Sequence, residues 1–226
     1  MPDILYIINP KGHGGAGLKA WDTFRISWGE PIDPSNVIMT ERAGHAEEIA
    51  AAENDYEIIA AVGGDGTVGE VISGMMKRAG ARPKLAIIPC GTGNDIARAA
   101  GIFSIADSVK ALRNKKEHAF DLIQVDGHVD GQAERRFAFI FGNTGFSGIP
   151  MIKPWMKRLL GATGAYYLAT LKQILVYRAP HMTVRVDDQE FTGNTYLVVA
   201  GNAEWASGGS MRIAPGALPD DGLLNI

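Results

Sequence analysis

The stretch from Val62 to Glu70, VGGDGTVGE, combines residue types that could bind a phosphate and a divalent cation. Glycines let backbone N–H groups approach an anion closely and adopt positive φ angles. Asp65 supplies a carboxylate that could hold Mg²⁺ directly or through water, and Thr67 supplies a hydroxyl for a phosphate. Phosphoryl transfer needs such an anion cradle and metal ligand, and little covalent chemistry. The alternative is a tight turn in which the Asp only caps a helix, but the run of glycines favours a functional site.

Short apolar runs rich in Ile and Val alternate with helix-like segments through the first half of the chain. The expected strands are Ile4–Ile8, Asn36–Thr40, Glu57–Val62 and Leu85–Pro89, and the expected helices are Leu18–Trp28, Ala46–Asn54 and Thr67–Ala79. This alternation predicts a parallel sheet covered by helices. Ligands of such sheets bind beyond the carboxyl ends of the strands. Three glycine clusters fall at those ends, namely Gly12–Gly17, Gly63–Gly69 and Gly91–Gly93.

The pattern changes after Ala119. The expected strands here are Asp121–Val125, Arg136–Gly142, Met182–Val186 and Thr195–Gly201, with turns at Asp126–Gly127 and Asp187–Asp188. Short strands joined by turns predict an antiparallel sheet or sandwich. The intervening segment Pro150–Arg178 mixes apolar, aromatic and basic residues and resembles a helical insertion. We therefore predict a nucleotide-binding α/β domain over residues 1–120 and a β-sandwich domain for the substrate over residues 121–226.

The composition excludes several classes of protein. Hydrophobic residues make up 46% and charged residues 21%, as in ordinary globular domains, and the net charge of −3 argues against a dedicated nucleic-acid binder. The single cysteine, Cys90, allows no intrachain disulfide, which fits a reducing compartment. We see neither a secretory signal nor an apolar run long enough to span a membrane. The expectation is a cytoplasmic protein whose membrane contact is peripheral. The basic, amphipathic Pro150–Arg178 segment could make that contact, or it could pack on the sandwich with a solvated basic face.

Several motifs resemble a known family. The GGDGT sequence Gly63–Thr67 resembles the nucleotide-binding signature shared by diacylglycerol kinases, sphingosine kinases and NAD kinases. Pro89–Arg98 contains GTGND, which resembles the diacylglycerol kinase catalytic family and separates it from NAD kinases. Further matches to that family are Asn9-Pro10 followed by Gly12–Gly17, Thr40 followed by Gly44-His45-Ala46, and Pro215–Leu224. The resemblance spans nearly the whole chain, with the motifs in the expected order.

The resemblance implies the two-domain architecture of the bacterial soluble lipid kinases, with ATP and Mg²⁺ as cofactors. The residues that it implies for nucleotide binding are Asn9, Thr40, Gly63, Gly64, Asp65, Gly66, Thr67, Glu70, Gly91 and Thr92. It places Asp65 and Asp95 at the reaction centre as catalytic residues. The family's second-domain motif binds a structural Mg²⁺ or Ca²⁺, and its ligands fall on the Asp221 carboxylate and the backbone carbonyls of Leu218 and Leu223. An ordinary turn is the alternative for that motif.

Three polar residues near these motifs have two interpretations. Arg98 lies one helical turn after Asp95 and could pair with it. Asp121 could join a network of metal and water at the cleft between the domains. All three could instead form a set of salt bridges between the domains.

The chain also departs from the family pattern. Gly12 replaces the usual Ser and Gly69 replaces the usual Asn, and both changes could lower nucleotide affinity. In the family, a later segment supplies a glutamate that acts as general base, whereas this sequence stops at Ile226. We therefore expect either a fragment of a longer protein or a shortened homologue. A sandwich without its last strands has an open edge, which favours pairing with another chain, such as a homodimer.

The leading hypothesis is an ATP- and Mg-dependent lipid kinase that transfers the γ-phosphoryl group to the hydroxyl of a diacylglycerol-type lipid. Its partners would be ATP and a lipid, with no nucleic acid. One alternative is an NAD kinase-like enzyme acting on a small molecule. Another is a non-catalytic nucleotide- or lipid-binding module, because the glutamate is missing. The residues do not distinguish diacylglycerol, phosphatidylglycerol and sphingoid lipids, since acyl pockets are lined by generic apolar side chains.

Overall fold

The computed structural model describes residues 3–52, 55–80, 82–129, 132–146, 168, 171–172 and 175–226. The chain forms two compact units. The first consists of Met1–Phe141 together with Gly201–Asn225, and the second of Gly142–Ala200 with Ile226. The candidate site lies entirely in the first unit.

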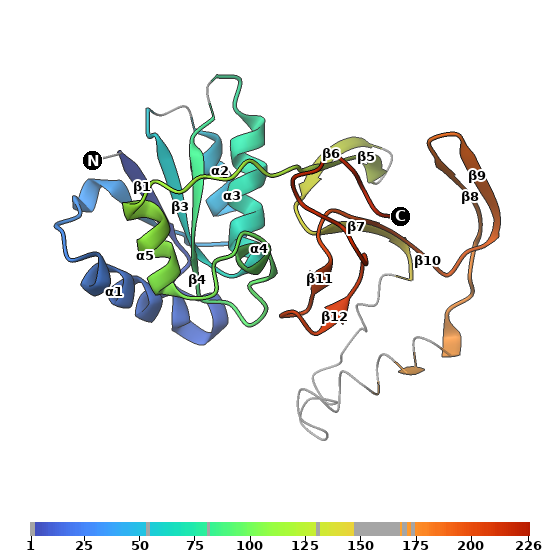
Figure 1. Cartoon of the computed structure of the whole chain (residues 1–226), viewed down its shortest axis with the longest axis horizontal. Coiled ribbons are helices and arrows are strands. Elements are labelled where there is room, and N and C mark those ends of the chain that lie inside the picture. Colours follow the sequence, from blue (N-terminus) through green and yellow to red (C-terminus); the bar gives the residue numbers. More distant parts are fainter. Residues whose placement is uncertain are drawn as a thin grey trace. The chain divides into compact units, whose positions relative to one another are not determined.

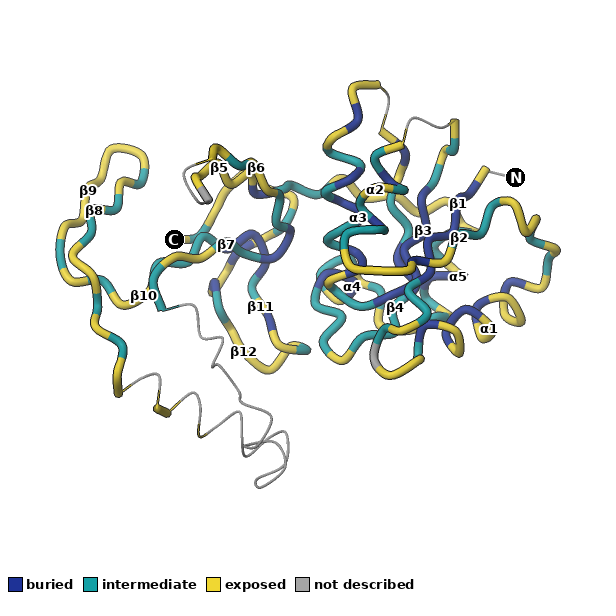
Figure 2. The backbone as a smooth tube through the Cα atoms, turned by 180° about the vertical axis from the view of Figure 1, so that it is seen from behind, coloured by how far each residue is buried: buried dark blue, intermediate teal, exposed yellow. Residues whose placement is uncertain are grey.

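A four-stranded parallel sheet forms the centre of the first unit (Figure 1). Its strands are β1 (Ile4–Ile8), β2 (Val37–Met39), β3 (Ile58–Gly63) and β4 (Lys84–Pro89), in the order β2-β1-β3-β4. All five residues of β1 and five of the six residues of β3 are buried, and Figure 2 colours these strands dark blue. Strands covered on both faces need continuous apolar runs, and these runs are what made the four strands predictable. The predicted parallel sheet is confirmed; both ends of β1 are as expected, and no end of the other three strands differs by more than one residue.

In the described part of the first unit, five helices accompany the sheet. They are α1 (Ala16–Trp28), α2 (His45–Ala51), α3 (Asp65–Lys77), α4 (Asp95–Ala99) and α5 (Ile105–Arg113). Two 3₁₀ turns, η1 (Gly12–Gly15) and η2 (Pro34–Asn36), lie in the connections on either side of α1. The sequence predicted α1, α2 and α3 but neither α4 nor α5. The five residues of α4 are too few to show an apolar period.

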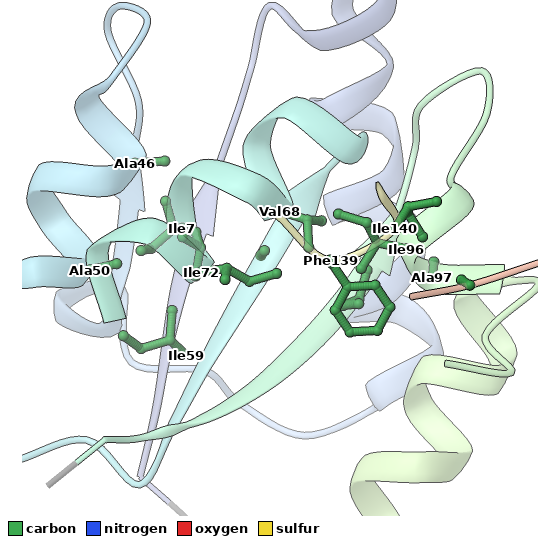
Figure 3. Packing of buried hydrophobic residues seen from close by; sticks show 14 of the residues in the cluster. Ile7, Ala46, Ala50, Ile59, Val68, Ile72, Ile96, Ala97, Phe139 and Ile140 are labelled. Atoms are coloured by element: carbon green, nitrogen blue, oxygen red, sulfur yellow. The ribbon is translucent and has the colours of Figure 1, made fainter. Parts of the chain in front are cut away.

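Alternate residues of the strands point to two separate cores. In β1, Leu5 and Ile7 pack with helices α2, α3 and α4, whereas Tyr6 and Ile8 pack with α1. The α1 side is aromatic, with Trp21 and Phe24 stacked 5.9 Å apart between ring centroids. Figure 3 shows the other core, where Ile7 and Ile59 of the sheet meet side chains of three helices. Phe139 and Ile140 complete this second core, so part of the chain after residue 120 packs in the same unit as the parallel sheet.

Helices α2 and α3 approach each other closely at Gly74. A Cβ atom at this position would lie 2.3 Å from the Glu47 carbonyl oxygen and 2.8 Å from the Ala50 Cβ atom. Gly69, in the same helix, has no neighbouring atom within 4 Å of its would-be Cβ. Gly69 and Gly74 therefore differ in the space around them, although both lie within α3.

We expect Gly74→Ala to lower the free energy of unfolding by about 1–3 kcal/mol, because the helices must separate to admit the methyl group. Gly69→Ala should raise it by about 0.5–1 kcal/mol, because alanine loses less backbone entropy in a helix than glycine. Urea denaturation of both variants measures the two effects. Equal shifts of the unfolding midpoint would contradict this account of the α2–α3 contact.

Beyond the parallel sheet, the first unit continues in antiparallel strand pairs. Strands β5 (Ile123–Val129) and β6 (Gln132–Ala138) pair antiparallel, as do the short β11 (Trp205–Ala206) and β12 (Met211–Arg212). The turn predicted at Asp126–Gly127 is wrong, because both residues lie inside β5 and face Arg135 and Glu134 of β6. An ion pair of 2.6 Å between Asp126 and Arg135 explains why the acidic residue sits within the strand.

The second unit is also built from strands. It contains β8 (His181–Val186), β9 (Gln189–Asn194) and all but one end residue each of β7 (Phe141–Gly145) and β10 (Leu197–Gly201). Strands β8 and β9 form an antiparallel hairpin whose turn is Asp187–Asp188, as predicted. The sequence did not reveal β9, and its expected strand Arg136–Gly142 is interrupted at residues 139–140, which separate β6 from β7. The helical insertion expected over Pro150–Arg178 lies for the most part outside the described residues.

The α/β sheet followed by antiparallel strands is the predicted fold class, and it is confirmed. The division into domains at residue 120 stays a prediction. No helix in the described ranges is long and apolar enough to cross a membrane.

Candidate active site

A pocket of about 610 Å³ lies where the parallel strands end. The loops after β1, β2, β3 and β4 all contribute to its wall. Its lining residues are Asn9, Lys11, Gly12, Thr40, Glu41, Arg42, Ala43, Ala46, Gly64, Asp65, Gly66, Thr67, Glu70, Gly91, Thr92 and Gly93. Because the carboxyl ends of parallel strands share one edge of a sheet, residues far apart in sequence meet here.

The structure brings most of the expected nucleotide-binding residues into this one pocket. Those that line it are Asn9, Thr40, Gly64, Asp65, Gly66, Thr67, Glu70, Gly91 and Thr92. Gly63 is not among the lining residues; it is the last residue of β3, and its carbonyl accepts the Cys90 N–H at 3.0 Å. Asp95 does not line the pocket and begins α4 beside it. Their individual roles stay predictions.

The glycines of the GGDGT and GTGND loops allow two backbones to touch. A Cβ atom on Gly91 would lie 2.7 Å from the Gly64 Cα atom, and one on Gly64 would lie 3.0 Å from the Gly91 Cα atom. None of the glycines in these two loops has a positive φ angle. The left-handed residue of the GTGND loop is Asn94, with φ of 52°, and close approach is the physical reason for glycine at positions 64 and 91.

In the part of the chain that the structure describes, the N–H groups of residues 65–67 in the first turn of α3 have no backbone partner, and these residues line the pocket. The first intrahelical bond runs from the Val68 N–H to the Gly64 carbonyl at 3.1 Å, so the N–H groups of residues 65–67 precede it. The N-cap residue of this helix, Gly64, has no side chain that could cap it. Unpaired N–H groups and the positive end of the helix dipole together favour an anion. Thr67 is buried beside them, and its Oγ1 atom accepts a 3.0 Å hydrogen bond from Asn9 Nδ2.

Asp65 makes a contact that the sequence did not reveal. Its Oδ1 atom accepts the Ile96 N–H at 3.0 Å, so it caps α4 and not its own helix. Asp95 is held in a similar way, since its Oδ1 atom accepts the Gly208 N–H at 2.7 Å. The second oxygen, Oδ2, of each carboxylate lies 3.2 Å from the would-be Cβ atom of Gly93. Both carboxylates thus direct one oxygen into the same small space.

The pairing of Asp95 with Arg98 that the spacing allowed does not occur among the described residues. Arg98 Nε donates instead to the Gly93 carbonyl at 3.1 Å. Asp121 binds the end of the chain, since its Oδ2 atom accepts the Gly222 N–H at 2.7 Å. These three residues therefore do not form a set of salt bridges with one another.

The loop after β2 also lines the pocket. Thr40 is buried, and its N–H donates to the Ile8 carbonyl at 2.8 Å. Arg42 makes two hydrogen bonds with Glu48, of 2.9 and 2.6 Å. The guanidinium thereby lowers the pKa of the Glu48 carboxyl, so the pair is charged at neutral pH. The Glu41 N–H donates to His45 Nδ1 at 3.1 Å, which closes the turn before α2.

Sequence reasoning missed four lining residues, Lys11, Glu41, Arg42 and Ala43, and it named Gly12, Ala46 and Gly93 only as members of motifs. Each lies within a few positions of a residue that was expected, and each follows a strand of the parallel sheet or opens the next helix. The rule that ligands bind beyond the strand ends could have identified them.

Cys90, next to this pocket, is half-buried, and burial raises the pKa of its thiol. A thiol held in its neutral form is a weak nucleophile. The side chain therefore fits the structural role expected from the sequence.

The metal site expected near the end of the chain lies on an exposed segment. Asp221 Oδ1 accepts the Leu223 N–H at 2.9 Å, and the Leu218 and Leu223 side chains are exposed. This set offers one carboxylate and two backbone carbonyls. Across the described ranges, no group of three or more His, Cys, Asp or Glu side chains is gathered as a metal site. Cation binding by Leu218, Asp221 and Leu223 stays a prediction.

Lys11 is the lining cation most available to a phosphate. Arg42 is already paired with Glu48, whereas Lys11 has no carboxylate partner among the residues that the structure describes. A charged hydrogen bond contributes about 1.5–3 kcal/mol, and exposure reduces that value. We expect Lys11→Met to raise the Kd for Mg·ADP about tenfold, and Lys19→Met, in α1 and outside the pocket, to leave it unchanged. Isothermal titration calorimetry measures both, and equal affinities would remove Lys11 from the phosphate site.

Comparisons with known proteins agree with this arrangement. The model of the diacylglycerol kinase catalytic domain matches residues 3–125, and that of the YegS C-terminal NAD kinase beta sandwich-like domain matches residues 155–226. A probable lipid kinase, YegS-like, from Citrobacter koseri is 30% identical over 230 residues, covering 100% of this chain and 73% of the relative. A diacylglycerol kinase from Staphylococcus haemolyticus is 30% identical over 195 residues, covering 85% of this chain and 56% of the relative.

A solved structure is also similar to this chain. The crystal structure of a diacylglycerol kinase from Bacillus anthracis superposes with a TM-score of 0.67 at 26% identity, covering 99% of this chain and 71% of that one. The chain spans between 56% and 73% of the lengths of curated relatives that it matches. The domain match covers the parallel sheet and every loop of the pocket. The chain therefore belongs to the diacylglycerol kinase catalytic domain family.

Proposed function

We propose that this chain is an ATP- and Mg-dependent lipid kinase that phosphorylates the hydroxyl of a diacylglycerol-type lipid. The observation that carries the proposal is the pocket at the strand ends, where the first turn of α3, the Gly91–Gly93 loop and Asp65 converge. A helix N-terminus and glycine-rich turns bind phosphates through backbone N–H groups. Family membership adds the reaction class, since its named relatives are lipid and diacylglycerol kinases.

The residues present fit a magnesium ion. Mg²⁺ prefers hard oxygen ligands and usually binds through one or two carboxylates together with substrate phosphates. Asp65 and Asp95 direct their Oδ2 atoms into one space beside Gly93, which lines the pocket. When bound, the metal would neutralise charge on the phosphates. The other lining residues that we propose for the nucleotide are Asn9, Thr40, Gly64, Gly66, Thr67, Glu70, Gly91 and Thr92.

The proposed transfer is a displacement at the γ-phosphorus. The lipid oxygen forms a bond to the phosphorus as the bond to the β,γ-bridging oxygen breaks, ADP leaves and the hydroxyl proton is released. The protein's contribution is positioning and electrostatic stabilisation. Lys11 and the N–H groups of residues 65–67 would hold the phosphates so that the lipid oxygen approaches the γ-phosphorus opposite the leaving oxygen. Because the acyl chains of the substrate stay in a bilayer, we also propose that the protein works at a membrane surface.

An acceptor panel tests the proposal. The chain is incubated with [γ-³²P]ATP and Mg²⁺ and with detergent micelles of diacylglycerol, phosphatidylglycerol or sphingosine, or with NAD. We expect label in an extracted lipid. Label in NADP alone would identify an NAD kinase-like enzyme. Binding of Mg·ADP without transfer to any acceptor would identify a non-catalytic module, and either result would overturn the proposal.

A further inference from the structure

The turn between β11 and β12, residues 207–210, has an unusual backbone. Ser207, Gly208 and Gly209 have successive φ angles of 56°, 70° and 80°. Left-handed backbone is costly for residues with a Cβ atom and is normally adopted singly. The turn is closed by the Ser210 hydroxyl, which donates to the Ser207 carbonyl at 2.7 Å. We call Ser207–Ser210 the 207–210 loop.

The 207–210 loop lies against the wall of the pocket. The Gly208 N atom is 3.5 Å from the would-be Cβ of Gly93, and the would-be Cβ of Gly208 is 3.6 Å from the Gly93 Cα atom. The would-be Cβ of Gly209 is 3.9 Å from Arg98 Nη1. A segment more than a hundred residues away in sequence thus packs on the GTGND turn, within the same compact unit.

One hydrogen bond joins this loop to the acidic pair. The Gly208 N–H donates to Asp95 Oδ1 at 2.7 Å, a short distance typical of a charged acceptor. With Oδ1 fixed, the other oxygen of Asp95 is set beside Gly93, where the Oδ2 atom of Asp65 also lies. Asp65 is fixed in the same manner by the Ile96 N–H. Each carboxylate therefore has one oxygen held by a backbone N–H and one directed to the shared space.

We propose that the 207–210 loop is a positioning element of the phosphotransfer site, and that Gly208 acts by orienting the Asp95 carboxylate. The inference rests on the proposed function and assigns a role to a segment outside the nucleotide-binding motifs. Groups that orient a metal-binding side chain typically change metal affinity by 10–100-fold when they are altered. Gly208 would thus act through Asp95 without touching the nucleotide.

The test measures metal binding separately from turnover. Gly208→Ala keeps the N–H but strains a backbone with φ of +70°, which displaces the loop. Gly29→Ala is the matched control, because Gly29 ends α1 with φ of +72° and does not line the pocket. Asp95→Asn keeps an oxygen that can accept the Gly208 N–H but removes the charge. Electron paramagnetic resonance of Mn²⁺ in the presence of ADP reports the fraction of metal bound.

We expect Gly208→Ala and Asp95→Asn each to weaken Mn·ADP binding about tenfold, while Gly29→Ala binds as the wild type does. The double variant Gly208→Ala with Asp95→Asn should be no weaker than Asp95→Asn alone, because both changes act on one carboxylate. Independent, multiplying effects would overturn the proposal, as would equal losses in Gly208→Ala and Gly29→Ala. Failure of every lipid to accept phosphate would refute the kinase assignment and leave this binding comparison intact.

Discussion

Replacing Asp65 by Asn is expected to lower the proposed lipid-kinase turnover by about 10²–10³-fold and to leave the fold intact. Loss of one preorganised electrostatic group at a site of charge development typically costs this much. The amide oxygen of Asn can still accept the Ile96 N–H, which Asp65 Oδ1 accepts at 3.0 Å in the native protein. The variant therefore removes the charge and keeps the cap on α4. Initial rates at saturating ATP, with a thermal melt on the same sample, measure the two effects.

Asp65→Ala provides the comparison, because it removes both the charge and the cap. It should be as inactive as Asp65→Asn and should melt at a lower temperature, since loss of a capping side chain costs about 1 kcal/mol. If Asp65→Asn kept wild-type turnover while Asp65→Ala lost it, the role of Asp65 would be to cap α4 alone. That result would contradict the proposed catalytic site.

Gly91→Ala is expected to reduce kcat/KM for ATP by about 10²-fold. The added methyl group would meet the Gly64 Cα atom at 2.7 Å and Asn94 Oδ1 at 2.9 Å, so the GTGND and GGDGT loops must move apart. Both loops line the pocket, and misplacement of a positioning group by about 1 Å can cost this much rate. Steady-state kinetics with varied ATP measure the loss.

Gly127→Ala serves as the control for this variant. Gly127 lies in β5, has no atom within 4 Å of its would-be Cβ and does not line the pocket. Its kinetics should equal those of the wild type. Wild-type kinetics in Gly91→Ala would show that the contact between the two loops is not needed for nucleotide binding.

The central sheet could be predicted because its strands are buried on both faces. The runs from Ile4 to Ile8 and from Ile58 to Val62 must be apolar throughout, and that requirement is visible in the sequence. Once these strands were assigned, the glycine clusters could be predicted to form the loops at the carboxyl ends of the strands. The short strand pairs were harder, because β9 reads QEFTGN and is largely exposed, with little apolar alternation. Helix α4 is too short for a helical period to be seen.

The site could be predicted as a set of loops but not as a set of contacts. The motifs indicated that Asp65 and Asp95 belong near the phosphates, and the pocket does gather the loops concerned. They did not indicate that Asp65 caps α4 or that Asp95 binds Gly208. The first of these bonds joins residues 31 positions apart in the sequence, and the second joins residues 113 positions apart. Such pairings depend on how the helices and the C-terminal segment pack on the sheet. Periodicity within one segment carries no information about them.

Hydrogen–deuterium exchange with and without Mg·ATP tests most directly the claim that the strand-end loops form the nucleotide site. The account predicts slower exchange on nucleotide binding in four segments, residues 9–17, 40–46, 63–70 and 91–95, and little change in the β8–β9 hairpin. Slower exchange in only one of these segments would not support the account, because residues of all four loops line the pocket. Unchanged exchange in residues 63–70 at saturating Mg·ATP, or protection confined to other segments, would contradict the account.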